Sequence, residues 1–126
     1  MTLRAVSLAG LVVALGSCAA SATSRPPDSG VRGRVLYGPT CPVQRPGQSC
    51  ERPYRATLVF RREPGNKLAL RVVSAADGGF TAHLAPGRYR LEPRNGNPYP
   101  RAQSETVSVR AERFTRLTVH YDSGIR

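Results

Sequence analysis

Residues 77–91 constrain the fold of this chain most strongly, because their apolar and polar residues alternate at the period of a β-strand. Two apolar series follow each other in this segment: Phe80, Ala82 and Leu84, then Tyr89 and Leu91. Between them, Pro86 presets φ for the second position of a turn, and Gly87 supplies the positive φ that a type II turn needs at its third position. Ahead of them, the Asp77 side chain can accept a hydrogen bond from the backbone two residues on. The segment therefore predicts two strands joined as a β-hairpin.

The rest of the chain supplies strand-like segments and no segment typical of a helix. Five further strands are expected: Val31–Tyr37, Ala56–Phe60, Lys67–Val73, Glu105–Val109 and Phe114–Tyr121. The residues expected to face inward from three of them are Val31, Val35, Tyr37, Leu68, Leu70, Val72, Leu117, Val119 and Tyr121. Seven short strands separated by turn residues, in a chain of 126 residues, predict one all-β domain with a seven-stranded antiparallel sandwich.

Two motifs around these strands resemble a known family. The entry Asp77-Gly78-Gly79-Phe80 and the later Pro86-Gly87-Arg88-Tyr89-Arg90-Leu91 are similar to the bacterial carboxypeptidase-regulatory-like domains. The tail Asp122–Arg126 also looks like the ending of small exported lipoproteins of this type. The resemblance implies an Ig/transthyretin-like β-sandwich over most of residues 30–126. That family is a scaffold with diverse uses, so the resemblance names no ligand.

The N-terminus resembles an export signal. One arginine, Arg4, precedes a mostly apolar run over residues 5–15 that is too short to span a bilayer of about 30 Å. The run ends in Leu15-Gly16-Ser17-Cys18, which resembles the bacterial lipobox, whose cysteine is lipidated before cleavage. An ordinary signal peptidase could instead cut after Ala22, discarding Cys18 and releasing a soluble secreted protein. The first alternative implies a lipid anchor in the membrane of the cell envelope.

The chain has three cysteines, and an exported protein rarely leaves a thiol idle. If Cys18 carries the lipid, Cys41 and Cys50 remain as a disulfide pair. The chain-entropy model gives a ring of about ten residues roughly 2.5–3 kcal/mol of stabilisation. A redox or metal site is the competing reading, but the spacing is not C-x-x-C and no second ligand pair accompanies it.

Three parts follow from these observations. Residues 1–17 are the predicted lipoprotein signal peptide, residues 18–30 a flexible linker of small and polar residues, and residues 31–126 the sandwich domain. If consecutive strands alternate in direction, the loops 38–54 and 93–103 and the turn 75–78 lie at one end of the sandwich. The chain enters the domain at the opposite end, so the two long loops are expected to face away from the membrane.

The formal net charge of +11 comes almost entirely from arginine, and it indicates an anionic partner. Arginines on the strands are expected to solvate an exposed sheet face. The candidate binding residues are those on the two proline-rich loops: Arg45, Arg52, Tyr54, Arg94, Tyr99 and Arg101. Planar guanidinium donors beside aromatic rings suit an acidic envelope polymer or an exported protein partner. In the alternative reading, Tyr54 and Tyr99 only cap the edge of the sandwich.

The chain carries none of the common sequence motifs of catalysis, metal binding or nucleic-acid recognition. His83 and His120 are expected on outward faces of separate strands without a carboxylate or cysteine at ligand spacing, so no metal site and no cofactor are predicted. Neither G-x-S-x-G nor H-E-x-x-H occurs, and an exported, tethered chain does not meet nucleic acid. We therefore expect a non-catalytic binding or structural module of the cell envelope. The alternative is an accessory or inhibitory subunit of an exported enzyme such as a peptidase.

Overall fold

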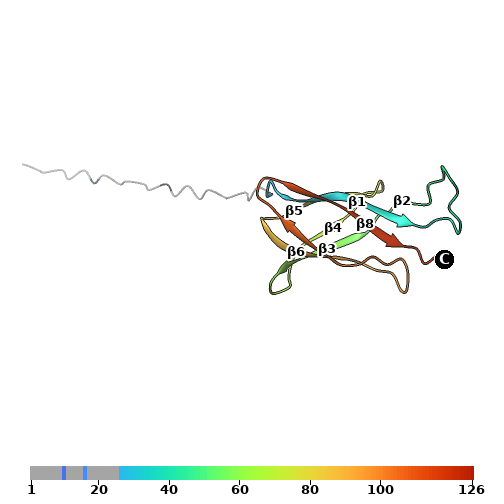
Figure 1. Cartoon of the computed structure of the whole chain (residues 1–126). Helices are drawn as coiled ribbons and strands as arrows, with labels where there is room; N and C mark the ends of the chain where they lie inside the picture. Colours follow the sequence, from blue (N-terminus) through green and yellow to red (C-terminus); the bar gives the residue numbers. More distant parts are fainter. Residues whose placement is uncertain (1–9, 11–15, 17–25) are drawn as a thin grey trace, which may run out of the picture.

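The fold is a β-sandwich of two four-stranded sheets, seen in a computed structural model that describes residues 10, 16 and 26–126 (Figure 1). Eight strands follow one another: β1 (Gly30–Gly38), β2 (Arg52–Pro53), β3 (Thr57–Glu63), β4 (Lys67–Val73), β5 (Gly79–His83), β6 (Gly87–Pro93), β7 (Glu105–Val109) and β8 (Phe114–Asp122). Seven of them lie where the alternation predicts strands. The eighth, β2, has two residues and pairs with Leu36 and Tyr37 at the end of β1, inside the loop where no regular structure was expected.

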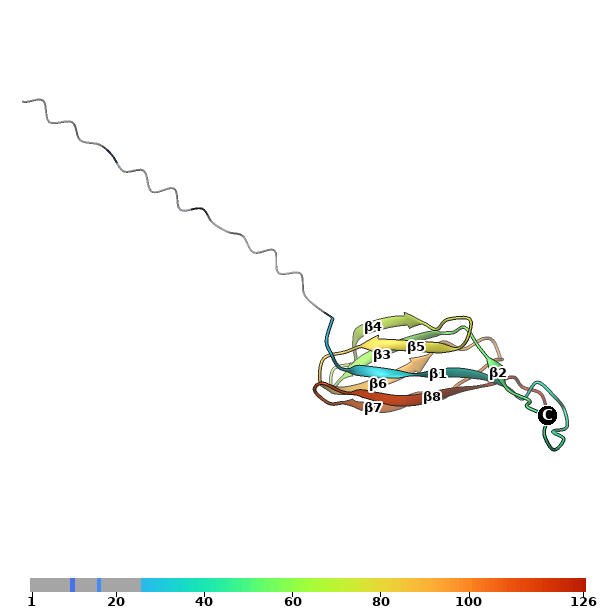
Figure 2. The same cartoon turned by 90° about the horizontal axis from the view of Figure 1, so that it is seen from above.

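One sheet contains β1, β2, β5 and β8, and the other has the order β4-β3-β6-β7 (Figure 2). Every neighbouring pair is antiparallel except β1 and β8, which run parallel from Gly30↔Phe114 to Gly38↔Asp122. The expectation of a purely antiparallel sandwich is therefore wrong for this pair. The reason is strand parity: the first and the last of seven alternating long strands point the same way, so they can pair only in parallel.

The hairpin predicted for residues 77–91 is also wrong, although its two strands are present. β5 pairs with β1 in one sheet, whereas β6 pairs with β3 and β7 in the other. The connection instead passes from one sheet to the other: Leu84 N donates to the Ser29 carbonyl at 2.9 Å, and the Tyr89 hydroxyl donates to the Ala85 carbonyl at 2.6 Å. Gly87 has a φ of 156°, far from the value of about 80° in a type II turn. The predicted acceptor role of Asp77 is confirmed, since its Oδ1 accepts from Gly79 N at 2.8 Å.

The core fills the space between the sheets with the inward residues that the alternation predicts. Its most buried side chains include Val31, Val35, Leu58, Phe60, Ala82, Tyr89, Leu91 and Tyr121. One prediction fails here, because Leu68 is 55% exposed. The register between β3 and β4 shifts at Phe60/Arg61, so Leu68 pairs with Arg61 instead of continuing the inward series of Leu70 and Val72. A β-bulge of this kind turns the following side chains to the other face of the sheet.

The sandwich begins before residue 31, which corrects the predicted boundary of the linker. Ser29 is buried, and its hydroxyl donates to the Leu84 carbonyl at 2.6 Å. Gly30 already belongs to β1, and its N–H donates to the Arg113 carbonyl at 3.1 Å. The predicted signal peptide and Cys18 lie outside the described residues, apart from Gly10 and Gly16.

Candidate binding surface

The two long loops meet at one end of the sandwich, together with the C-terminal segment (Figure 1). We call this region, residues 38–54, 94–104 and 122–126, the loop end. Ser123 ties it together, since its N–H donates to the Gly38 carbonyl at 2.9 Å and its hydroxyl to the Pro39 carbonyl at 2.6 Å. Arg101 and Asp122 exchange backbone hydrogen bonds of 3.0 and 2.7 Å. The chain enters the domain at the opposite end, so the arrangement expected from strand parity is confirmed.

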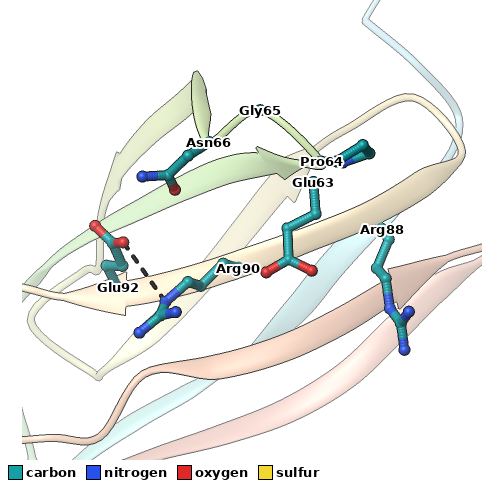
Figure 3. Close-up of a pocket in the computed structure, with 7 residues that line it drawn as sticks. All are labelled: Glu63, Pro64, Gly65, Asn66, Arg88, Arg90 and Glu92. Carbon is teal, nitrogen blue, oxygen red and sulfur yellow. Dashed lines mark ion pairs between the residues drawn. The ribbon is translucent and has the colours of Figure 1, made fainter.

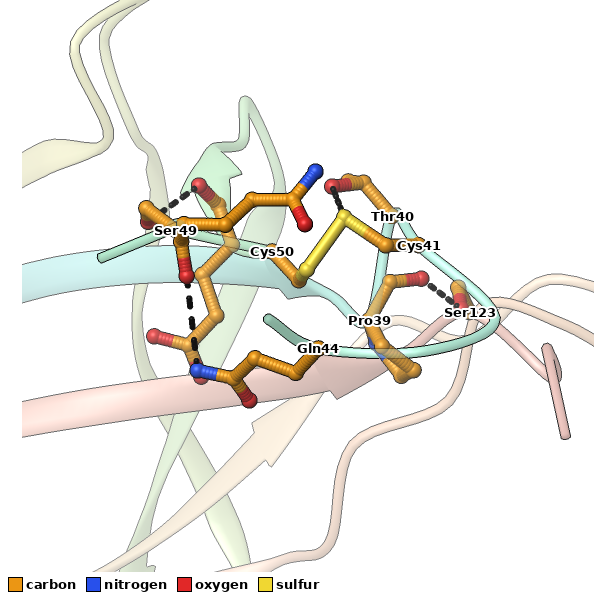
Figure 4. The surroundings of a disulfide bond; sticks show 9 residues. Pro39, Thr40, Cys41, Gln44, Ser49, Cys50 and Ser123 are labelled. Carbon is orange, nitrogen blue, oxygen red and sulfur yellow. Dashed lines mark hydrogen bonds between the residues drawn. A yellow bond between two sulfur atoms is a disulfide. The ribbon is translucent and has the colours of Figure 1, made fainter. Parts of the chain in front are cut away.

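A disulfide between Cys41 and Cys50 closes the first loop, as predicted (Figure 4). The two Cα atoms lie 5.4 Å apart, and Cys50 is buried while most of the ring between the cysteines is exposed. Thr40 N donates to the Cys50 carbonyl at 2.7 Å, and Gln48 N donates to the Arg45 carbonyl at 3.0 Å. The loop is therefore held at its base by a covalent bond and carries its exposed residues on a closed ring.

Three tyrosines form the floor of the loop end. The Tyr54 ring lies between Tyr37 and Tyr121, with centroid distances of 5.4 and 5.0 Å. The guanidinium carbon of Arg52 lies 4.8 Å from the centroid of the Tyr37 ring, a cation–π distance. Tyr54 and Arg52 were predicted as contact residues. Tyr54 is half-buried at the sandwich edge, as in the alternative interpretation, whereas Arg52 is exposed above this floor.

Tyr121 joins this floor to the second loop. Its side chain is 1% exposed, and its hydroxyl donates to the Arg94 carbonyl at 2.7 Å. Burial raises the pKa of Tyr121 to about 12, and the neighbouring Tyr54 phenol adds to the effect. Arg94 N in turn donates to the Thr57 carbonyl at 2.9 Å. The backbone of Arg94 is thus fixed from both sides, while its side chain is exposed.

The second loop packs against the C-terminal segment through Tyr99. A Cβ at Gly124, which has a φ of +86°, would approach within 2.6 Å of the Tyr99 ring, so only glycine lets the segment lie there. The guanidinium carbon of Arg126 lies 6.0 Å from the Tyr99 centroid, and its Nη2 lies 2.9 Å from Asp122 Oδ2. This hydrogen bond from Arg126, followed by one from the Gly124 N–H, lowers the pKa of Asp122.

The loop end also gathers exposed apolar side chains. Among the described residues, five large hydrophobic side chains are clearly exposed, and three of them belong to this end: Val43 at 69%, Tyr99 at 44% and Ile125 at 37%. A hollow at Tyr99 is lined by Arg90, Asn95, Tyr99, Arg101, Ala102, Gln103, Ser104 and Asp122. Apolar and aromatic groups with arginines around them are the composition of protein interaction surfaces.

The six predicted contact residues therefore all lie at the loop end. Five of them form two groups, and the sixth lies apart from both. Arg52 and Tyr54 belong to the tyrosine floor, whereas Arg94, Tyr99 and Arg101 surround the second loop. Arg45 is exposed on the disulfide ring. Sequence reasoning missed the contributions of Val43, Ile125 and Arg126. Strand parity carries the last strand toward this end, so the C-terminal residues could have been included.

A separate groove lies on the outer face of the other sheet, beside the turn between β3 and β4 (Figure 3). It is lined by Glu63, Pro64, Gly65, Asn66, Arg88, Arg90 and Glu92. Glu92 lies 3.0 Å from Arg61 Nε and 3.6 Å from Arg90 Nε, and the Glu63 carboxylate points into the space between Arg88 and Arg90. Acidic and basic groups thus balance one another in this groove.

The histidines have local partners in the fold. His83 Nδ1 lies 3.0 Å from the Pro27 carbonyl and its ring stacks edge-on against Phe114, while His120 lies 3.5 Å from Glu51. Within residues 10, 16 and 26–126, no three His, Cys, Asp or Glu side chains lie close enough to hold a metal ion. In the same part of the chain, no helix is long and apolar enough to cross a membrane.

The chain has distant structural similarity to solved proteins. No family model matches the chain, and no curated protein matches it. The crystal structure of a DUF3823 family protein from Parabacteroides merdae ATCC 43184 is similar at 20% identity with a TM-score of 0.44. The match covers 75% of this chain and 47% of that one, so the chain spans about half the length of this neighbour.

Proposed function

We propose that this protein is a non-catalytic binding module of the bacterial cell envelope, tethered by a lipid on Cys18, with the loop end as its contact surface. The observation that carries the proposal is the convergence of both long loops and the C-terminal segment at the end opposite the chain entry. A tether at that entry would present the loop end to the space beyond the bilayer. The carboxypeptidase-regulatory-like identity of the sandwich belongs to the same proposal.

The chemistry of the loop end supports an anionic partner with apolar parts. Arg45, Arg52, Arg94 and Arg101 have no carboxylate within salt-bridge distance, and every Asp and Glu of the chain lies in the described part. Guanidinium groups bind carboxylate and phosphate through two parallel hydrogen bonds. Val43 and Tyr99 supply exposed apolar area beside them. An acidic glycan or phosphate-bearing polymer of the envelope fits this combination.

A second candidate is an accessory or inhibitory subunit of an exported enzyme. The disulfide ring favours it, because Val43 is 69% exposed on a loop whose base is covalently closed. A closed ring loses little conformational entropy when it inserts into a partner. In-cell cross-linking from the ring separates the two: a single enzyme partner supports this candidate, whereas cross-links to envelope polymer support the first.

The tether is tested by comparing the wild type with Cys18→Ala in the native host. We expect the wild type to carry the mass of a lipid and to partition into membranes, and the variant to lose both. A mature wild-type protein that begins at Thr23 and is soluble would contradict the tether.

The contact surface is tested with the triple variant Arg45→Gln, Arg52→Gln and Arg101→Gln. The matched control removes the same charge elsewhere, with Arg62→Gln, Arg71→Gln and Arg110→Gln. Retention on purified anionic envelope polymer should fall about tenfold in the first variant and less than about twofold in the control. Equal losses in both variants would mean that net charge, and not the loop end, governs binding.

A further inference from the structure

The outer face of the β1–β8 pair carries three arginines close together. The parallel register places Arg32 directly opposite Arg116 and Arg34 opposite Thr118. Neighbouring strands lie about 4.8 Å apart, and residues i and i+2 of one strand point to the same face. Arg32, Arg34 and Arg116 are all exposed on this face, near the end where the chain enters. The register thus builds a compact triangle of positive charge.

No Asp or Glu side chain forms an ion pair with these three arginines, although Asp77 lines a neighbouring hollow together with Arg32. All eight Asp and Glu residues lie in the described part, and the four ion pairs formed there involve Arg61, Arg90, His120 and Arg126. Like charges directly opposite each other across two strands destabilise a sheet. The arrangement therefore costs stability unless something anionic lies between the guanidinium groups.

A hollow in the surface lies among the three side chains. It is lined by Arg32, Gly33, Arg34, Arg116, Leu117 and Thr118. Gly33 allows the close approach of β1 to β8 here, since a Cβ would collide with the Leu117 carbonyl oxygen. The guanidinium carbon of Arg32 lies 4.8 Å from the centroid of the Phe114 ring, which restricts the orientation of this side chain. One of the three donors is thus held in place before any ligand arrives.

The groove of Figure 3 shows that arginines on a sheet face are not always arranged in this way. There, Arg88 and Arg90 share the groove with Glu63 and Glu92. The β1–β8 hollow contains three arginines and no acidic residue in its lining. The two surfaces therefore differ in net charge: the groove of Figure 3 is balanced, whereas the β1–β8 hollow is positive and favours an anion.

We propose that the β1–β8 hollow is a binding site for a phosphate or sulfate group. Arg32, Arg34 and Arg116 would surround the tetrahedral oxyanion with paired N–H donors, and the Thr118 hydroxyl would supply a further donor. The site is separate from the loop end and does not depend on a lipid at Cys18. The group can come from a soluble phosphate or from an anionic lipid headgroup, since the hollow lies toward the chain entry.

The test uses inorganic phosphate with the wild-type protein at constant ionic strength, with chloride as the replaced anion. We expect saturable binding in the millimolar range, with shifts of the Gly33 and Thr118 amide signals in NMR spectra. At ten times Kd, phosphate should raise the unfolding midpoint by about 5–10 °C. The variant Arg32→Gln with Arg116→Gln should bind about tenfold more weakly, and the control Arg71→Gln with Arg110→Gln should stay within about twofold.

The unfolding midpoint of a single variant provides a second test that does not require tight phosphate binding. In chloride at low ionic strength, Arg116→Gln should raise the unfolding midpoint by about 2 °C, because it removes the repulsion with Arg32. Phosphate should abolish this advantage. If phosphate does not saturate, or if both double variants lose affinity equally, the site is wrong.

Vesicles of phosphatidylcholine with and without phosphatidylglycerol distinguish the two sources. Binding to the anionic vesicles that depends on Arg32 and Arg116, and that inorganic phosphate displaces, would assign the site to a lipid headgroup. Saturation by phosphate without such vesicle binding would assign it to a soluble phosphate. Since every arm depends on Arg32 and Arg116 and on neither Cys18 nor the loop end, failure here leaves the proposed tether and loop end untouched.

Discussion

The sandwich core and the loop end are held together by different forces. In the core, side chains such as Phe60, Leu58 and Leu91 are fully buried between two sheets. At the loop end, most residues of 38–54 and 94–104 are exposed, and the contacts are a disulfide, a tyrosine floor and backbone hydrogen bonds through Ser123 and Asp122. The comparison indicates that burial stabilises the domain, whereas cross-links shape the surface that it presents.

Phe60→Ala should produce the largest effect, because it removes a fully buried ring from the middle of the core. Such truncations cost about 3–5 kcal/mol of unfolding free energy. If the loop end depends on the core, both regions should unfold in one transition at lower urea concentration, followed by circular dichroism and tyrosine fluorescence. Val43→Ala, at a 69% exposed position, serves as the control and should change stability by less than about 0.5 kcal/mol. If the loop end of Phe60→Ala unfolds in a separate transition, the stability of the loop end does not depend on the core.

Cys41→Ser with Cys50→Ser should affect the loop end more than the core. The chain-entropy limit for a ring of this size is about 2.7 kcal/mol. We expect a smaller loss of global stability, because the opened loop gains freedom in the folded protein as well as in the unfolded one. Hydrogen exchange should accelerate at the amides of Thr40 and Ser123, and stay slow at core strands β3 and β6. Faster exchange throughout the core would show that the two regions are one cooperative unit.

Alkaline pH should weaken the junction between the two regions through Tyr121. Its pKa is about 12 in the folded protein against the ordinary tyrosine value of 10.0, so the folded state holds the proton after the unfolded state has lost it. The stabilisation is complete below pH 10 and is lost as the pH rises toward 12, with a loss on the order of 1 kcal/mol at pH 11. Urea titrations of the wild type and of Tyr121→Phe should show a shallower pH slope for the variant. Identical slopes would contradict the assignment to Tyr121.

The sequence predicts the strands well because alternation reports directly on which face of a segment is buried. Phe80, Ala82, Tyr89 and Leu91 face the core as expected. The alternation of apolar and polar residues does not indicate, however, which strand pairs with which neighbour in a sheet. Two strands that face each other across a core show the same pattern as two strands of one hairpin, which is why the pairing of β5 with β6 was predicted wrongly. The bulge that exposes Leu68 depends on the register with β3 and has no signal in the sequence.

The location of the candidate surface could be predicted because strand parity and the cysteine count are both readable in the chain. The ring partners of Tyr54 could not, since its position between Tyr37 and Tyr121 depends on three segments far apart in sequence. The contact of Gly124 with Tyr99 could not be predicted for the same reason. Similarly, the triangle of Arg32, Arg34 and Arg116 requires the parallel register of β1 with β8, which the expected antiparallel arrangement excluded.

Arg52→Gln should have the smallest effect on stability and tests whether the loop end is a surface for binding or for packing. The Arg52 guanidinium lies over the Tyr37 ring at a solvent-exposed position. A cation–π contact at such a position contributes about 0.5–1 kcal/mol to the free energy of unfolding. We expect a stability loss at the lower end of that range in urea titration, because glutamine retains part of the packing on the ring. Arg55→Gln removes the same charge from a neighbouring exposed position and provides the control. If Arg52 serves binding, its variant should weaken retention on anionic envelope polymer more than Arg55→Gln does, despite nearly equal stabilities. If the two variants are retained equally and differ only in stability, Arg52 serves the packing of the tyrosine floor. This residue would then resemble the core, which stabilises the domain, and not the contact surface of the loop end.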